Sequence, residues 1–278
     1  MSPSFNIPIC IINYRCASPY TNLDEFAALS MVLEGVGVSA YLGAAASIIN
    51  KDYLTAAGSI LTTEARHAAY VSSVPPNSQA PWSTAFDVPL DFDEVYSLAG
   101  LSAFNMHSLS RSDHTGFSAP FITSCPSTNP ALPVKKFPAL NVTTTGYTAG
   151  SNVTMAFAAN STDNVTDMFV AFLSGSNATY ARYDAPSKSC LIPATLAGAG
   201  TVYAVVTTSN SSNGTAPTDD STIAGPAVLL FPSNSTVRNS STAMAGVKTN
   251  DGLRGNREAF LGWTAVMAAI AGLAATTM

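Results

Sequence analysis

The chain has 278 residues, of which 47% are hydrophobic and 10% are charged, and its formal net charge is -5. This apolar content is enough for a real hydrophobic core, which excludes a wholly disordered chain. The 12 Lys and Arg residues form no basic run, which argues against a nucleic-acid partner because phosphate binding needs clustered positive charge. The cysteines lack the CxxC spacing of zinc ribbons and thioredoxin-type sites. They are Cys10, Cys16, Cys125 and Cys190.

A helical hairpin is predicted in the N-terminal part of the chain. The first helix has Thr21 or Asn22 as its candidate N-cap, because both side chains can accept a hydrogen bond from the first turn. It continues through the apolar stretch 26–49. We expect the second helix to begin with Asp52 as its N-cap and to end before Pro75, since proline cannot continue a helix.

Three side chains of this hairpin have the chemistry of metal ligands. Glu34 is the charged residue within the apolar first helix, and Glu64 and His67 form a Glu-x-x-His motif on the second. Glu34 lies 17 residues before Lys51 and His67 lies 16 residues after it. At about 1.5 Å per residue both are roughly 25 Å from the turn, so the three side chains are expected at the same height.

Two interpretations of these residues are open. One helix that supplies Glu and a partner that supplies Glu-x-x-His make one half of a di-metal carboxylate site, which binds iron or manganese. Alternatively, Glu34 forms a structural pair with His67 or Arg66, because a buried carboxylate needs a cation, a metal or a proton.

The pattern changes from period 3.6 to period 2 at residue 137. A short helix is predicted before it, over residues 92–100 of a Pro-rich stretch. Short apolar or β-branched runs, separated by turn residues, then predict an antiparallel, immunoglobulin-like β-sandwich over residues 137–232. The expected strands cover residues 139–144, 153–158, 168–173, 178–183, 191–192, 202–207 and 227–231.

Nine Asn-x-Ser/Thr acceptors lie in the second half of the chain, and residues 1–140 contain none. Such acceptors are modified on surface loops of secreted proteins, so we expect a glycoprotein. The acceptors are Asn141, Asn152, Asn160, Asn164, Asn177, Asn210, Asn213, Asn234 and Asn239.

The C-terminus has the features of a lipid-anchor signal. A Ser/Thr-rich stalk over residues 233–257 precedes a hydrophobic tail, residues 258–278. Small residues, a polar spacer and an apolar tail are typical of a glycosylphosphatidylinositol (GPI) signal, with Asn250 as the favoured attachment residue and Ala243 or Gly246 as alternatives. A permanent membrane helix is the other interpretation of the tail.

The N-terminus lacks the secretion signal that a lipid-anchored protein would need. Residues 1–15 lack a basic segment followed by a long apolar run, so they do not form a convincing signal peptide. We expect the true N-terminus to lie upstream of this chain.

Three segments carry a family resemblance. They are VLEGVGVSAYLGAAASIINKDYLTAAGSILTTEARHAAYV, PLDFDEVYSLAG and FITSCPSTNPALPVKKFPAL. They resemble the fungal secreted ferritin-like proteins described as stress-response, desiccation-related or late-sexual-development proteins, over residues 16–100 and 119–232. The resemblance implies a four-helix ferritin-like domain, a following β domain and a cell-surface or secreted location, without an established enzymatic activity. It places Glu34, Glu64 and His67 at ligand positions of the family's second helix pair, and implies a Cys16–Cys125 disulfide. Cys190 is also expected to form a disulfide in an oxidising compartment.

Two departures from that family follow. Its first helix pair is absent, and residues 1–15 do not resemble it. Residues 100–118 interrupt the matching stretch and are interpreted as an insert, so His107 and His114 within it are expected to be exposed loop residues rather than ligands. A half-bundle would expose the apolar faces of both helices, so the hairpin is expected to form a homodimer or to need the missing helices.

The predicted fold class is therefore α+β and multidomain: a partial ferritin-like bundle over residues 16–136 with only the second helix pair, followed by the β-sandwich. The favoured function is a stress- or development-associated structural role at the cell surface or in the cell wall, with at most a partial metal site. A di-iron or di-manganese carboxylate oxidoreductase, completed by missing helices or by a homodimer, is the alternative. Adhesion to wall polysaccharide through the β domain is a weaker one.

Overall fold

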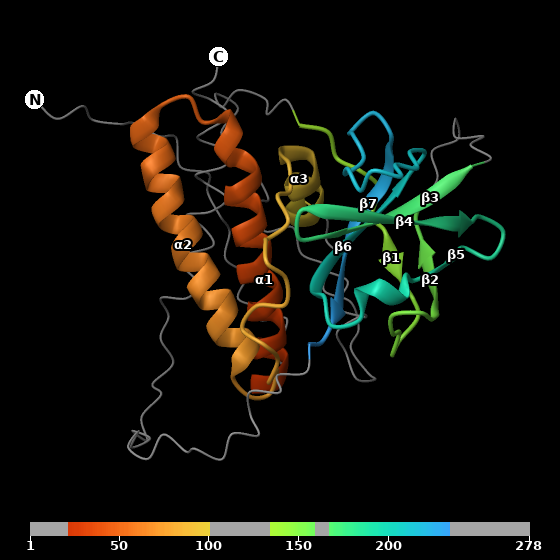
Figure 1. The fold of residues 1–278 in the computed structure, drawn as a ribbon, viewed down its shortest axis with the longest axis horizontal. Coiled ribbons are helices and arrows are strands. Elements are labelled where there is room, and N and C mark those ends of the chain that lie inside the picture. The colour runs from red at the N-terminus through yellow and green to blue at the C-terminus, as the bar shows by residue number, and fades with distance from the viewer. Residues whose placement is uncertain (1–21, 101–133, 159–166, 234–278) are drawn as a thin grey trace, which may run out of the picture.

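The computed structural model describes residues 22–100, 134–158 and 167–233. In these ranges an antiparallel helical hairpin lies beside a β-sheet (Figure 1). Helix α1 is located between α2 and the sheet, and α3 packs against both α1 and strand β7. The β domain therefore lies directly on the hairpin.

The hairpin forms where the sequence predicts it, but the first helix ends before the expected residue 49 and the second has a different N-cap. Helix α1, Leu23–Ala44, begins after Asn22, whose side chain accepts from the backbone N–H of Glu25 at 3.0 Å. A 3₁₀ turn, Ala45–Ser47, follows it. Helix α2, Lys51–Ser73, begins after Asn50, whose side chain accepts from the N–H of Asp52 at 2.8 Å. The expected N-cap at Asp52 is therefore wrong, because Asn50 supplies the acceptor and Asp52 lies in the first turn.

Helix α3, Phe92–Gly100, has the predicted bounds and a reciprocal capping arrangement. The Asp91 carboxylate accepts from the N–H of Glu94 at 2.8 Å, and the Glu94 carboxylate accepts from the N–H of Asp91 at 3.0 Å. The chain that enters the β domain is fastened to this helix, since Phe137 N–H donates to Ser97 Oγ at 2.8 Å. These bonds connect the helical and β parts of the protein.

All seven predicted strands are present in the described ranges. They form one antiparallel sheet, nearly barrel-shaped, in the order β1-β2-β5-β4-β3-β6-β7. Short strand β5 pairs with β2 on one side and β4 on the other, so the expected immunoglobulin-like sandwich of two sheets is not confirmed. The strands are β1 Asn141–Val142, β2 Asn152–Ala156, β3 Met168–Ser174, β4 Asn177–Asp184, β5 Ser189–Leu191, β6 Gly200–Thr207 and β7 Thr222–Phe231.

Strand β3 is buried on both of its faces. Val170 and Phe172 point into the core enclosed by the sheet, and the intervening Ala171 and Leu173 point to the opposite face. Successive side chains of a strand alternate between the faces of a sheet, so the continuous apolar run requires a cover on the outer face. Helix α1 supplies it.

The contact between α1 and the sheet corrects the expectation of an exposed apolar face for α1. Val32, Val36 and Ala40 of α1 share one apolar cluster with the outer face of the sheet, and Ser39 Oγ hydrogen-bonds the hydroxyl of Tyr203 at 3.0 Å. The sheet therefore covers the side of α1 that faces away from α2. The sheet residues in this cluster are Ala171, Leu173, Ala178, Tyr203 and Val205.

The burial of α1 also accounts for its composition. The segment Leu23–Ser47 is long and apolar enough to cross a membrane, yet half of its most apolar window is buried within the protein. Contact with α2 on one side and the sheet on the other requires apolar residues around most of the helix. Helix α2 is different, because only Ala57 and Glu64 are fully buried in it.

Strand β5 contains a free thiol. Cys190 is 3% exposed and lies opposite Val153 and Tyr183 in the sheet core. Within the described residues Cys190 forms no disulfide and its side chain points inward, and the other three cysteines lie outside these ranges. Burial raises the pKa of this thiol to about 12, so it remains protonated at neutral pH.

The buried Glu94 side chain gives the protein a predicted pH dependence. Burial, followed by the charge of Asp91, raises the pKa of Glu94 to about 8 from 4.5. The folded state therefore binds this proton more tightly than the unfolded state does, so stability is full below about pH 4.5 and declines as the pH rises toward 8. Between pH 5 and pH 8 we expect the wild type to lose about 2 kcal/mol more unfolding free energy than Glu94→Gln, because the variant has no carboxyl group to ionise at this position. Urea unfolding at both pH values measures this, and identical pH slopes for the two proteins would contradict it.

Candidate metal centre

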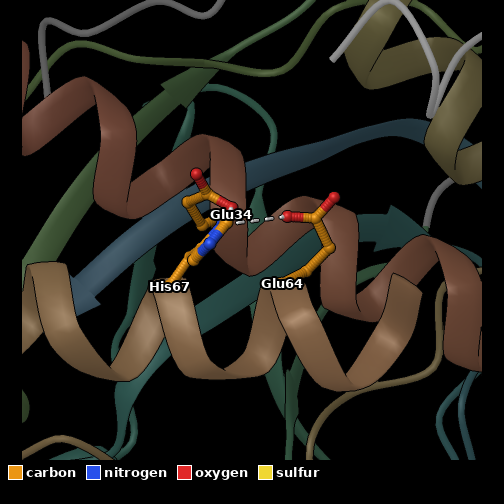
Figure 2. Close-up of side chains that lie close together, drawn as sticks. All are labelled: Glu34, Glu64 and His67. Carbon is orange, nitrogen blue, oxygen red and sulfur yellow. Dashed lines mark hydrogen bonds and ion pairs between the residues drawn. The ribbon is translucent and has the colours of Figure 1, made fainter. Parts of the chain in front are cut away.

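Glu34, Glu64 and His67 meet between the two long helices. Glu34 is on α1, and Glu64 and His67 are one turn apart on α2. Figure 2 shows the three side chains pointing toward one another across the helix interface. The antiparallel hairpin brings them to the same height, as their spacing from the turn predicts.

The distances suit a shared cation. His67 Nδ1 lies 3.3 Å from Glu34 Oε2 and 3.7 Å from Glu64 Oε2. One ligand atom from each residue can be chosen so that all three lie within 4.8 Å of one another. Ligands that bind one ion at about 2.1 Å are roughly 3 Å apart when they are at right angles. Small side-chain rotations therefore bring these atoms around a single ion.

The two carboxylates are largely removed from water, whereas the imidazole is not. The exposed fractions of the side chains are 15% for Glu34, 10% for Glu64 and 55% for His67. Burial, followed by the hydrogen bond and the negative charge of Glu64, raises the pKa of Glu34 to about 8. Two carboxylates that share a buried space without a strong cation hold a proton in this way, and a metal ion could take its place.

Gly37 makes room for one of the carboxylates. A Cβ atom at Gly37 would lie 3.5 Å from Glu64 Cγ and 3.7 Å from its carboxyl carbon. Gly37 follows Glu34 by three residues, so the two share one face of α1. The glycine therefore lets α2 bring Glu64 close to α1. The sequence signals this role only through the spacing between Glu34 and Gly37.

The structure decides between the two structural pairings considered for Glu34. Arg66 donates from Nη2 to Thr63 Oγ1 at 3.1 Å, whereas Glu34 contacts His67. The donor set of two carboxylates and one imidazole is compatible with iron or manganese. A half-exposed histidine balances the charge of two buried carboxylates poorly. A divalent ion would balance both charges.

The other predicted site residues lie mainly outside the hairpin. Four glycosylation acceptors are exposed on the sheet or its loops: Asn152, Asn177, Asn210 and Asn213. Asn141, on β1, is half-buried. Their exposure is compatible with modification but does not test it. The remaining predicted residues fall outside the described ranges: Asn160, Asn164, Asn234, Asn239, Asn250, Cys16, Cys125, His107 and His114.

Comparison with known proteins agrees with the geometry of the hairpin. Residues 3–75 match the family model for the ferritin-like domain, and all three ligand candidates lie inside this segment. The match begins at residue 3 and so includes most of residues 1–15. No curated protein matches the chain. The class of protein is thus a ferritin-like N-terminal helical region joined to an antiparallel β domain.

Proposed function

We propose that the helical hairpin holds one divalent metal ion, iron or manganese, through Glu34, Glu64 and His67. The observation that carries this proposal is the convergence of two buried carboxylates and an imidazole from both helices. Bound there, the ion would neutralise the paired carboxylates and join α1 to α2. The protein then has a structural role in which metal binding stabilises the hairpin.

We further propose that this role is performed at the cell surface, in a stress or developmental context. Support comes from the exposed acceptors of the β domain and from the residue pattern of the C-terminal tail. The arrangement would be a GPI-anchored glycoprotein, attached through Asn250, with glycans on the β domain next to wall polysaccharide. The sequons lie outside the hairpin, so glycans there would leave the metal centre accessible.

A second candidate is a di-metal carboxylate oxidoreductase completed by another half-site. The observation that favours it is the 55% exposure of His67, which leaves the centre open on one side. A second copy of the chain could add another Glu and Glu-x-x-His set there, since ferritin-like di-metal centres combine two such sets.

Titration with Co²⁺, as a spectroscopic probe for divalent ions, tests the proposed metal site on the full chain. We expect saturable binding, weakened at least about tenfold in Glu34→Gln and in His67→Ala, because each substitution removes one ligand. Asp52→Asn is the matched control, since it neutralises an exposed acid on α2 away from the centre. Equal affinity in all four proteins would refute the site.

A further inference from the structure

Tyr41 has a buried hydroxyl without a hydrogen-bond partner among the described residues. Its side chain is 2% exposed. Within the part of the chain that the structure describes, its hydroxyl is a buried polar atom without a hydrogen bond. An unsatisfied buried hydroxyl is costly, and buried polar groups in folded proteins nearly always have a partner. This hydroxyl therefore requires an explanation.

The position of Tyr41 connects it to the metal centre. It follows Glu34 by seven residues and Gly37 by four, so the three residues share the α1 face that meets α2. The ring packs with Ile48 and Ala57 in the hairpin's own apolar cluster. Gly37 is the point where Glu64 approaches α1, one helical turn from Tyr41.

The Tyr41 hydroxyl is available as a hydrogen-bond donor. Burial, followed by the negative charge of Glu64, raises the pKa of Tyr41 to about 12. The phenol therefore stays protonated at neutral pH. A neutral phenol can donate one hydrogen bond.

We propose that Tyr41 is a positioning residue of the metal centre, whose hydroxyl donates a hydrogen bond to the Glu64 carboxylate when that carboxylate binds a metal ion. This inference rests on the proposed metal site. A ligating carboxylate uses one oxygen for the ion and is oriented by a hydrogen bond to the other. Without metal, Glu64 Oε2 instead lies 3.7 Å from His67 Nδ1 (Figure 2), and the Tyr41 hydroxyl has no partner among the described residues.

Tyr41→Phe tests the inference, because it removes the hydroxyl and keeps the ring. We expect it to weaken Co²⁺ binding by the full chain about tenfold. Without metal, its thermal midpoint should equal or exceed that of the wild type, since an unsatisfied buried group is lost. Tyr53→Phe is the matched control, because Tyr53 packs against the same cluster from α2, and its affinity should stay within about twofold of the wild type.

The outcomes separate the inference from the metal site itself. Wild-type affinity in Tyr41→Phe, together with weakened binding in Glu34→Gln, would overturn the role of Tyr41 and leave the metal site intact. A lower metal-free midpoint in Tyr41→Phe would also overturn it, because the hydroxyl would then support the fold rather than the ligand. Absence of saturable Co²⁺ binding by the wild type would overturn both.

Discussion

The Gly43→Ala variant is expected to lose about 3 kcal/mol of unfolding free energy, the largest single effect that the structure predicts. Gly43 lies on α1 where the chain before α3 crosses the helix. An added Cβ would overlap the carbonyl oxygen of Leu90 and lie 2.6 Å from its carbonyl carbon. Leu90 is 1% exposed, and its N–H donates to the Ser39 carbonyl at 3.1 Å. The methyl group would therefore push this backbone off α1.

Gly35→Ala is the matched control for this prediction. Gly35 is on the same helix, and a Cβ there would meet nothing within 4 Å. Its replacement should stabilise α1 by about 0.5 to 1 kcal/mol, since alanine is a better helix former than glycine. Guanidinium unfolding measures both variants. Shifts of the same sign in both would contradict the tight contact at Gly43.

The second large effect concerns the two carboxylates of the metal centre. In the absence of metal, the double variant Glu34→Leu/Glu64→Leu is expected to be about 2 kcal/mol more stable than the wild type. Replacing buried ionisable groups by apolar ones of similar size is often stabilising. The raised pKa of Glu34 reflects the cost of burying its charge. The same variant should gain no stability from added Mn²⁺, whereas the wild type should melt at a higher temperature with Mn²⁺ present.

This variant distinguishes a metal site from a structural pair. If the contact between Glu34 and His67 served mainly to hold the helices together, its removal would destabilise the metal-free protein. Glu34→Gln/Glu64→Gln is the control, since it keeps the shapes and removes the charges. Thermal unfolding of the three proteins with and without Mn²⁺ is the measurement. A metal-free double leucine variant that is less stable than the wild type would contradict the metal interpretation.

The triad could be predicted because it depends on helix geometry alone. A regular rise per residue fixes the height of each side chain once the turn is located, so Glu34 and His67 could be placed without coordinates. The turn itself was misjudged by two residues, since Asn50 and Asp52 are both competent N-caps and only the observed hydrogen bonds decide between them.

The packing of the β-sheet on α1 could not be predicted in the same way. A helix that is apolar on most sides requires burial but does not specify its partner. The resemblance suggested missing helices, whereas Val36 of α1 shares an apolar cluster with Tyr203 and Val205 of the sheet. The uninterrupted apolar run from Val170 to Leu173 was the available signal, because a strand buried on both faces needs a second layer. Short strand β5 likewise pairs on both sides, which strand lengths alone do not reveal.

Tyr41 was missed for a related reason. In the sequence it is one aromatic residue in an apolar helix, and such residues usually serve packing. Its spacing from Glu34 could have drawn attention to it, but only the three-dimensional structure shows that its hydroxyl lacks a partner in the described part of the chain.

The most direct test of the metal centre is native mass spectrometry of the full chain after incubation with Mn²⁺ and removal of unbound ions. The metal-site proposal predicts one retained ion per chain in the wild type and none in Glu34→Leu/Glu64→Leu. A wild type that retains no ion, or a double variant that retains the same ion, would contradict the assignment of Glu34, Glu64 and His67 as its ligands.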